Sequence, residues 1–300
     1  MFQRVLVTNE ESHYSPQPLL KASALCAESS HIEWFQSVYN AAFETATAED
    51  QPSQEDALAL YVTHRLNQAE RHIEELDLPQ DVAADIRWHP SFLKAALEES
   101  DRYQPDLMVV PRVRKHDLLD WLIGGDEQEL VRRLHEPVLL ANDQPWQAHP
   151  RIAVAIDPFH LDSRNHRLEK QLLEVADQFA QRLSAELHVV HCFQTLPQSV
   201  IYDEHLVEDF ESLQKQVGEE HRQRIESLIE PLNRPLGSPL LKLIVGDADE
   251  KLPEFCQQEK IDLLILGAPE KGWVERFLMG STTARLLNRI ESDILVIHDQ

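Results

Sequence analysis

Glycine and hydroxyl side chains gather near the end of the sequence in an order that suits phosphate binding. A short apolar run is followed by Gly267, and a predicted helix then opens with Gly280, Ser281, Thr282 and Thr283. The first turn of a helix offers unpaired N–H groups and the positive end of the helix dipole to an anion. The pattern therefore predicts a phosphate-binding site.

A simpler explanation of the same residues stays open. Glycines such as Gly267 and Gly280 also serve tight turns and close helix packing without any ligand. Asp157 follows the first apolar strand of the second half. There it can cap a helix or stand as a surface acid at the end of a strand.

Histidines are numerous, at 15, so a metal site has to be considered. His188 and His191 lie three residues apart on a predicted strand, where side chains alternate between faces, so they should point apart. No other histidine or cysteine has the spacing of metal ligands. Sequence motifs for a catalytic nucleophile are also missing. We therefore predict neither a metal site nor a catalytic residue.

The sequence repeats itself. Residues 106–141 align without a gap on residues 262–297, and Asp106 falls on Asp262 at the start of this match. The beginnings of the two halves match as well, with Asn9 in the first half at the position of Asp157 in the second. The self-similarity predicts two copies of one unit.

The boundaries of the two copies follow from composition. Residues 142–150 contain two prolines and lie between the last apolar run of one copy and the first of the next. We therefore expect one domain over 1–141, a linker over 142–150 and a second domain over 151–300.

Short apolar runs alternate with helical patterns in both copies, which is typical of a parallel sheet with helices on both faces. The expected fold class is α/β, with two tandem doubly wound domains, each a five-stranded parallel sheet flanked by helices. In the second copy we expect a strand that ends at Leu266 and a helix over 283–290. In the first copy, 42–54 reads as a loop that leads into a long helix.

Composition limits the partners and the compartment. Asp and Glu outnumber Lys and Arg by 52 to 28, giving a formal charge of -24, which argues against direct binding to nucleic acid or anionic lipid. We expect no signal peptide and no membrane insertion, because apolar runs are short. The three cysteines are widely spaced, as expected of reduced thiols in a cytoplasmic protein.

The glycine-rich segment resembles the loop of the universal stress protein family, which runs G-x2-G-x9-G-[ST]. Gly267, Gly280 and Ser281 fit this frame. The resemblance implies a fold like that of the adenine nucleotide alpha hydrolases and binding of ATP with Mg²⁺. It assigns contact with adenosine to Asp157 and the lining of the base to backbone near Val190. It assigns the phosphates to Gly280, Ser281, Thr282 and Thr283.

Two departures from the family pattern bear on this site. Glu270 stands at the second glycine, and a carboxylate beside a triphosphate disfavours binding unless a metal ion or Lys271 compensates its charge. Gly272 can take over the turn, because the loop keeps its length. In the first copy the corresponding positions hold Pro111, Arg114, Gly125 and Asn9. We therefore expect the first copy to have lost the nucleotide site.

The expected function is that of a cytoplasmic, non-catalytic stress-resistance protein, with at most slow ATP hydrolysis, whose second copy binds ATP or a related nucleotide. The alternative is a nucleotide-independent scaffold or an apolar-ligand-binding protein that acts through its interfaces. Trp121, Leu122 and Ile123 would then cover an apolar ligand in the first copy. The resemblance also implies an internal pseudo-dimer through the last strand of each copy, and homodimerisation is open.

Overall fold

The computed structural model describes residues 2–10, 15–45, 54–112, 126–159, 167–194, 207–232, 239–268 and 289–298. The chain divides into two compact units, 1–145 and 146–300. The division falls within 142–150, the segment in which the sequence predicts a linker.

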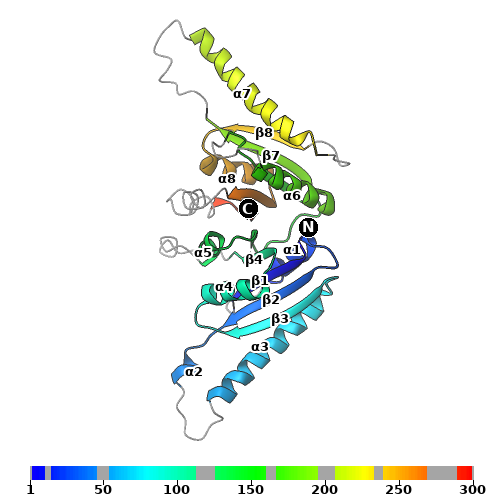
Figure 1. The fold of residues 1–300 in the computed structure, drawn as a ribbon, viewed down its shortest axis with the longest axis vertical. Coiled ribbons are helices and arrows are strands. Elements are labelled where there is room, and N and C mark those ends of the chain that lie inside the picture. The colour runs from blue at the N-terminus through cyan, green and yellow to red at the C-terminus, as the bar shows by residue number, and fades with distance from the viewer. Residues whose placement is uncertain are drawn as a thin grey trace. The chain divides into compact units, whose positions relative to one another are not determined.

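The first unit contains a parallel sheet of five strands in the order β3-β2-β1-β4-β5. Its strands are β1 (Arg4–Glu10), β2 (His31–Val38), β3 (Asp81–Trp88), β4 (Leu107–Pro111) and β5 (Val138–Ala141). Its helices are α1 (Gln17–Leu25), α2 (Ala42–Thr45), α3 (Gln54–Leu76), α4 (Phe92–Tyr103) and α5 (Asp126–Arg133). Helices α1 and α3 lie on one side of this sheet, and α4 and α5 lie on the other (Figure 1).

The second unit repeats the arrangement, with a parallel sheet in the order β10-β9-β6-β7-β8. Its strands are β6 (Arg151–Ala155), β7 (Glu186–Phe193), β8 (Leu240–Val245), β9 (Leu263–Ala268) and β10 (Asp293–His298). The helices described are α6 (Arg167–Leu183), α7 (Val207–Ile229) and α8 (Ala248–Glu259). Helices α6 and α7 lie on one side of the sheet and α8 on the other (Figure 1).

This arrangement of helices follows from the handedness of parallel crossovers, which is right-handed in nearly all proteins. In each unit the chain first winds outward in one direction from its first strand and then returns to wind in the other. The helices of the two windings therefore cover opposite faces. The predicted fold class, two tandem doubly wound α/β units, is confirmed.

The winding reverses next to β1 in the first unit and next to β6 in the second. β6 lies between β7, which follows it in the chain, and β9. In open α/β sheets a crevice forms beyond the carboxyl ends of the strands at such a reversal, and ligands bind there. A ligand site is therefore expected at the carboxyl end of β6.

An equivalent aspartate in each unit accepts the same backbone hydrogen bond. In the first, Gln3 N donates to Asp106 Oδ2 (2.7 Å) at the start of the central strands. In the second, Arg151 N donates to Asp262 Oδ2 (2.9 Å). The alignment places Asp106 on Asp262, so the sequence repeat corresponds to a repeated structural contact.

Two local predictions were wrong. Within the predicted loop 42–54, the chain forms the short helix α2, and Phe43 anchors it, with its ring 5.3 Å from that of Tyr61 and 5.5 Å from that of Trp88. The strand predicted to end at Leu266 continues through Ala268, because Gly267 pairs with Ile297 of β10. Gly267 therefore belongs to the sheet and not to a loop.

Some predictions fall on residues that the structure does not describe or on the association of the two copies. Most of the predicted helix 283–290 lies outside the described residues. Among the described residues, none of the helices has the length and apolar character needed to cross a membrane. The pairing of the two copies through their last strands, and any association of whole chains, stay predictions.

Candidate functional site

Asp157 lies where the sequence places it, two residues after β6 and exposed at the carboxyl end of the sheet. Its Oδ1 accepts a hydrogen bond from Phe159 N at 3.2 Å, the turn that aspartate and asparagine commonly form with the residue two positions on. The carboxylate therefore shapes the turn, and its other oxygen has no hydrogen bond to any described residue. An exposed charged acceptor at a sheet reversal suits a ligand that donates hydrogen bonds.

A pair of histidines lies beside this turn. His191 of β7 is 2 % exposed, and its Nδ1 lies 2.9 Å from the carbonyl oxygen of Ile156. A carbonyl can only accept, so Nδ1 carries the hydrogen, and Nε2 of the neutral ring is an acceptor. His221 Nδ1 lies 2.7 Å from that nitrogen and therefore donates to it. The hydrogen bonds run in one direction, from α7 through β7 to the backbone that follows β6.

Two phenylalanines complete the cluster. The ring of His221 lies 3.9 Å from that of Phe159 and 4.7 Å from that of Phe193, and both pairs are stacked. The rings of His191 and Phe193 are nearly parallel, with an interplanar angle of 5°. The guanidinium of Arg224 lies over Phe159 at 4.8 Å. These five side chains form an aromatic and cationic group next to Asp157.

The electrostatics of the pair favour neutral rings. Burial lowers the pKa of His191, although its hydrogen bond to Ile156 and the charge of Asp157 act the other way. Burial also lowers the pKa of His221, and His191 and Arg224 add to this effect while Asp157 and Glu220 oppose it. Desolvation dominates in both cases because it disfavours the charged ring.

The sequence missed this cluster. His191 and His221 are 30 positions apart on different elements, so their spacing carries no ligand signature. The prediction that His188 and His191 point to opposite faces holds, since His188 packs against Phe255 of α8 and His191 against His221 of α7.

Gly267 is needed for packing. A Cβ at this position would lie 2.8 Å from Leu168 Cδ2 and 2.9 Å from Leu172 Cδ1, both on α6. Such distances are too short for carbon atoms in contact, so the missing side chain lets α6 approach β9 closely. The packing explanation of this glycine is sufficient, and its role beside a phosphate stays a prediction.

The other predicted ligand residues divide into two groups. Val190 is buried within β7, and its carbonyl oxygen already accepts a hydrogen bond from Ile156 N at 3.0 Å. β7 continues beyond it to Phe193, so its part in lining a base stays a prediction. The residues expected to hold phosphates lie outside the described residues: Gly280, Ser281, Thr282 and Thr283. Glu270, Lys271 and Gly272 lie outside them too.

The equivalent position in the first unit differs in chemistry. Asn9 is 3 % exposed, where Asp157 of the second unit is exposed. Its Nδ2 has no hydrogen-bond partner among the described residues. The position therefore presents a buried amide in place of an exposed carboxylate, and the two units offer different groups to a ligand.

A cluster of ionised side chains lies elsewhere in the first unit. The carboxylate oxygens of Glu33, Asp85 and Glu99 lie within 4.8 Å of one another, close enough to hold a cation. Arg102 already lies 2.9 Å from Asp85 and 2.6 Å from Glu99, and Arg87 pairs with Glu99 as well. Two guanidiniums thus occupy the place that a cation would take.

Burial and the neighbouring Glu99 raise the pKa of Glu33 to about 8. With Glu33 protonated, two carboxylates face two guanidiniums and the charges balance. A raised pKa means that the folded protein holds this proton more tightly than the unfolded chain does. Its stabilising contribution is complete below about pH 4.5 and declines as the pH rises to about 8.

We expect the variant Glu33→Gln to remove this decline, since glutamine resembles the protonated acid at every pH. Between pH 6 and 8.5 the first unit of the wild type should lose about 1–2 kcal/mol of unfolding free energy that the variant keeps. Urea denaturation across this range measures the difference. Glu28→Gln, at an exposed position of the same unit, should follow the wild type. Parallel pH profiles for wild type and Glu33→Gln would contradict the assignment.

Comparison with known proteins agrees with the fold. The model of the universal stress protein family matches residues 149–298. A crystal structure from Pseudomonas aeruginosa superposes with a TM-score of 0.68 at 19% identity, covering 99% of this chain and 93% of that one. A universal stress protein from Archaeoglobus fulgidus gives a TM-score of 0.63 at 13% identity, covering 98% and 96%.

The chain belongs to the universal stress protein family. Within the family it resembles the tandem type: it is 20% identical to universal stress protein E of Escherichia coli over 309 residues, covering 99% of this chain and 94% of the relative. Both halves of the chain take part in this similarity.

Proposed function

We propose that the second unit binds ATP or a related nucleotide with Mg²⁺ at the carboxyl ends of β6 and β9, and that the protein acts in stress resistance without a defined catalytic turnover. The observation that carries the proposal is the exposed Asp157 carboxylate at the sheet reversal. Its free oxygen suits the hydroxyl groups of a ribose. Family membership supports the same assignment.

The remaining parts of the nucleotide follow from the sequence. Gly280, Ser281, Thr282 and Thr283 would hold the phosphates through the first turn of the predicted helix. Mg²⁺ would neutralise charge on the phosphates and on Glu270, with oxygen ligands supplied largely by the nucleotide and water. In the first unit, Asn9 and Pro111 replace the aspartate and the first glycine, so one nucleotide per chain is expected.

Calorimetric titration with ATP and Mg²⁺ tests the proposal. The wild type should bind one equivalent, and Asp157→Asn should weaken binding by about tenfold, because a hydrogen bond to a charged group is lost. Asparagine can still accept from Phe159 N, so the turn is kept. Gly280→Asp should abolish binding by adding a charge at the phosphates. Asp101→Asn, at an exposed position of α4, is the matched control and should bind like the wild type.

No binding by the wild type at millimolar ATP would end the nucleotide proposal. Equal losses for Asp157→Asn and Asp101→Asn would show that net charge, and not this site, governs binding. The second candidate, a role through the protein's surfaces without nucleotide, is favoured by one specific observation, the exposed apolar side chains of Leu240 and Val245 at the ends of β8.

We also propose a cytoplasmic location. Cys26, Cys192 and Cys256 are all free, as is typical of a reducing compartment. Burial raises the pKa of Cys192 to about 11 and that of Cys256 to about 12, which keeps both thiols protonated. Cell fractionation that found the protein outside the cytoplasm would contradict this location.

A further inference from the structure

β8 is the outer strand of the second unit's sheet and pairs with β7 on one side. Its sequence, LLKLIV, contains a single charged residue. Leu240 is 45% exposed and Val245 is 52% exposed, and among the described residues Leu60 is the other large apolar side chain with strong exposure. Strong apolar exposure is thus concentrated at the two ends of one edge strand.

Among the described residues, the outer strand of the first unit carries more charged side chains than β8 does. β3 carries Asp81, Asp85 and Arg87, and charged side chains on an edge strand discourage the addition of another strand. Helix α3 also packs along β3, where Tyr61 meets Trp88 edge to face at 6.2 Å. The two copies are repeats of one unit, so the more apolar edge of β8, which pairs with no described strand on its outer side, is a specific difference between them.

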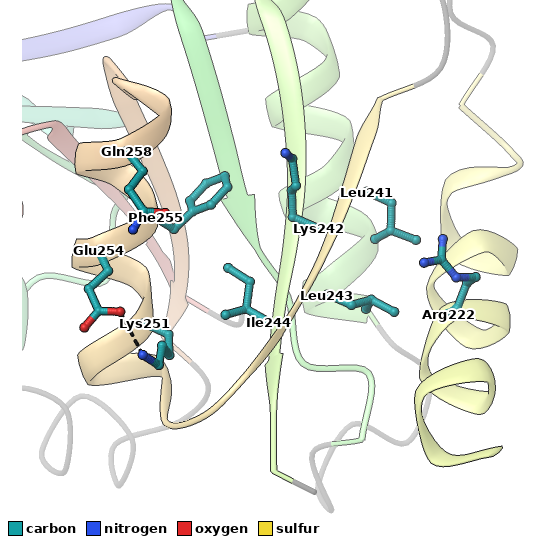
Figure 2. Close-up of a pocket in the computed structure, with 9 residues that line it drawn as sticks. All are labelled: Arg222, Leu241, Lys242, Leu243, Ile244, Lys251, Glu254, Phe255 and Gln258. Carbon is teal, nitrogen blue, oxygen red and sulfur yellow. Dashed lines mark hydrogen bonds and ion pairs between the residues drawn. The ribbon is translucent and has the colours of Figure 1, made fainter. Parts of the chain in front are cut away.

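β8 forms the floor of a groove of about 370 Å³ between α7 and α8. Figure 2 shows that Leu241 and Leu243 point toward α7, where Arg222 lies, whereas Lys242 and Ile244 point toward α8. This division follows from the alternation of side chains along a strand. The α7 side of the groove therefore presents Leu241 and Leu243 beside Arg222, and the α8 side presents Lys242 beside Ile244.

The charge of the groove is opposite to that of the whole chain. Arg222, Lys242 and Lys251 line it against one carboxylate, Glu254, although the chain has a formal charge of -24. Lys242 lies 2.9 Å from Glu259. Lys251 lies 2.8 Å from Glu254, and Figure 2 marks this pair with a dashed line. Exposed pairs of this kind contribute little free energy, so a bound carboxylate can replace them at small cost.

We propose that β8 is a docking edge for an extended segment of another protein in which apolar and acidic side chains alternate. The segment adds to the sheet as a further strand through main-chain hydrogen bonds. Its apolar side chains lie over Leu241 and Leu243 on the α7 side, and its carboxylates face Lys242 and Lys251 on the α8 side. Apolar and acidic side chains alternate along the segment, and successive side chains of β8 point in turn toward α7 and toward α8.

A second copy of this chain fits the groove less well than a single strand does. Each copy would bring its own α7 and α8 to an edge that these helices already flank. Two chains of charge -24 also repel each other, and this repulsion acts against a small interface.

Fluorescence anisotropy with two synthetic heptapeptides tests the proposal, one alternating leucine with glutamate and the other leucine with lysine. The full chain should bind the glutamate peptide with a dissociation constant below about 100 µM, and the lysine peptide at least about tenfold more weakly. Added salt should weaken binding of the glutamate peptide. Hydrogen exchange should show slower exchange of the amides of residues 240–245 when the peptide is bound.

The variant Lys242→Glu should reverse the preference between the two peptides, because it changes the sign of charge on the α8 wall. Leu243→Asp should abolish binding of both. Leu60→Lys, which alters the other exposed apolar side chain, is the matched control and should bind like the wild type. Circular dichroism would confirm that each variant folds.

Equal binding of the two peptides by the wild type, or an unchanged preference in Lys242→Glu, would overturn the proposal. The proposal would also be overturned if the bound peptide slowed the exchange of amides elsewhere in the chain and left those of β8 unchanged. Dimerisation in sedimentation experiments that Leu243→Asp abolishes, without peptide binding by the wild type, would assign the edge to a second copy instead. Nucleotide binding at Asp157 is measured separately, so either proposal can fail without the other.

Discussion

His191→Ala should lower the unfolding free energy of the second unit by about 2–4 kcal/mol. The substitution leaves a cavity beneath the ring of Phe193 and deprives Ile156 O and His221 Nδ1 of their hydrogen-bond partner. Urea denaturation of the full chain measures the loss, and hydrogen exchange should localise it to β7 and α7.

His191→Phe separates packing from hydrogen bonding. Phenylalanine keeps a planar ring beside Phe193 but cannot pair with Ile156 or His221, so we expect a loss of about 1–3 kcal/mol, smaller than that of alanine. His31→Ala is the control, because the His31 side chain is largely exposed and pairs with Asp81 at the surface. It should change stability by less than about 0.5 kcal/mol. An equally small effect of His191→Ala would contradict the buried pair.

The same pair gives the second unit a pH dependence of known sign. The pKa values of His191 and His221 are both lowered from the ordinary value of 6.5, so the unfolded chain binds protons more readily than the folded one. The stabilising contribution of the neutral pair is present above pH 6.5 and is lost as the pH falls through the lowered pKa values. Replacing both histidines, His191→Phe together with His221→Phe, should flatten this acid side of the stability profile.

Gly267→Ala should lower the unfolding free energy of the second unit by about 1–2 kcal/mol. The new methyl group meets Leu168 and Leu172, both buried, and overpacking of this kind costs about 1–3 kcal/mol. Alanine also lowers the conformational entropy of the unfolded chain, which offsets about 0.4–1 kcal/mol of the lost stability. Gly218→Ala is the control, because the nearest atom to an added Cβ there is 4.0 Å away. It should stabilise α7.

The clash can be relieved from the other side. In the double variant Gly267→Ala, Leu168→Ala, the shorter side chain on α6 leaves space for the new methyl group. The loss should therefore be smaller than the sum of the two single losses by about 0.5–1.5 kcal/mol. Additive losses would show that α6 and β9 do not meet closely at Gly267. ATP titration of Gly267→Ala also separates packing from ligand binding, since a purely structural glycine leaves affinity unchanged.

The fold could be predicted from the sequence because it depends on two signals that a single sequence carries: the periodicity of each segment and the repeat between the two halves. Strand and helix periods alternate along each half, and the gapless match from Asp106 and from Asp262 shows one unit used twice. The end of β9 was harder to predict, since a glycine after an apolar run suggests a turn. Whether the strand continues depends on Ile297 of β10, which lies 30 positions away.

The candidate site could be predicted only in part. Asp157 was found because the resemblance to the family assigns a ligand contact to the aspartate that ends the first strand. His221 was missed because its part in the site depends on how α7 packs against β7, and nothing in the spacing of histidines reveals this. Glu33, Asp85 and Glu99 were missed for the same reason, because β2, β3 and α4 bring them together only in the folded unit.

The direction of the histidine hydrogen bonds fixes where a proton can enter. Ile156 O requires the hydrogen on Nδ1 of His191, and His221 Nδ1 donates to Nε2 of the same ring. The outer nitrogen of His221, Nε2, is then the one ring nitrogen that can gain a proton without breaking either bond. The two rings therefore take up one added proton between them, on His221, and behave toward acid as one base.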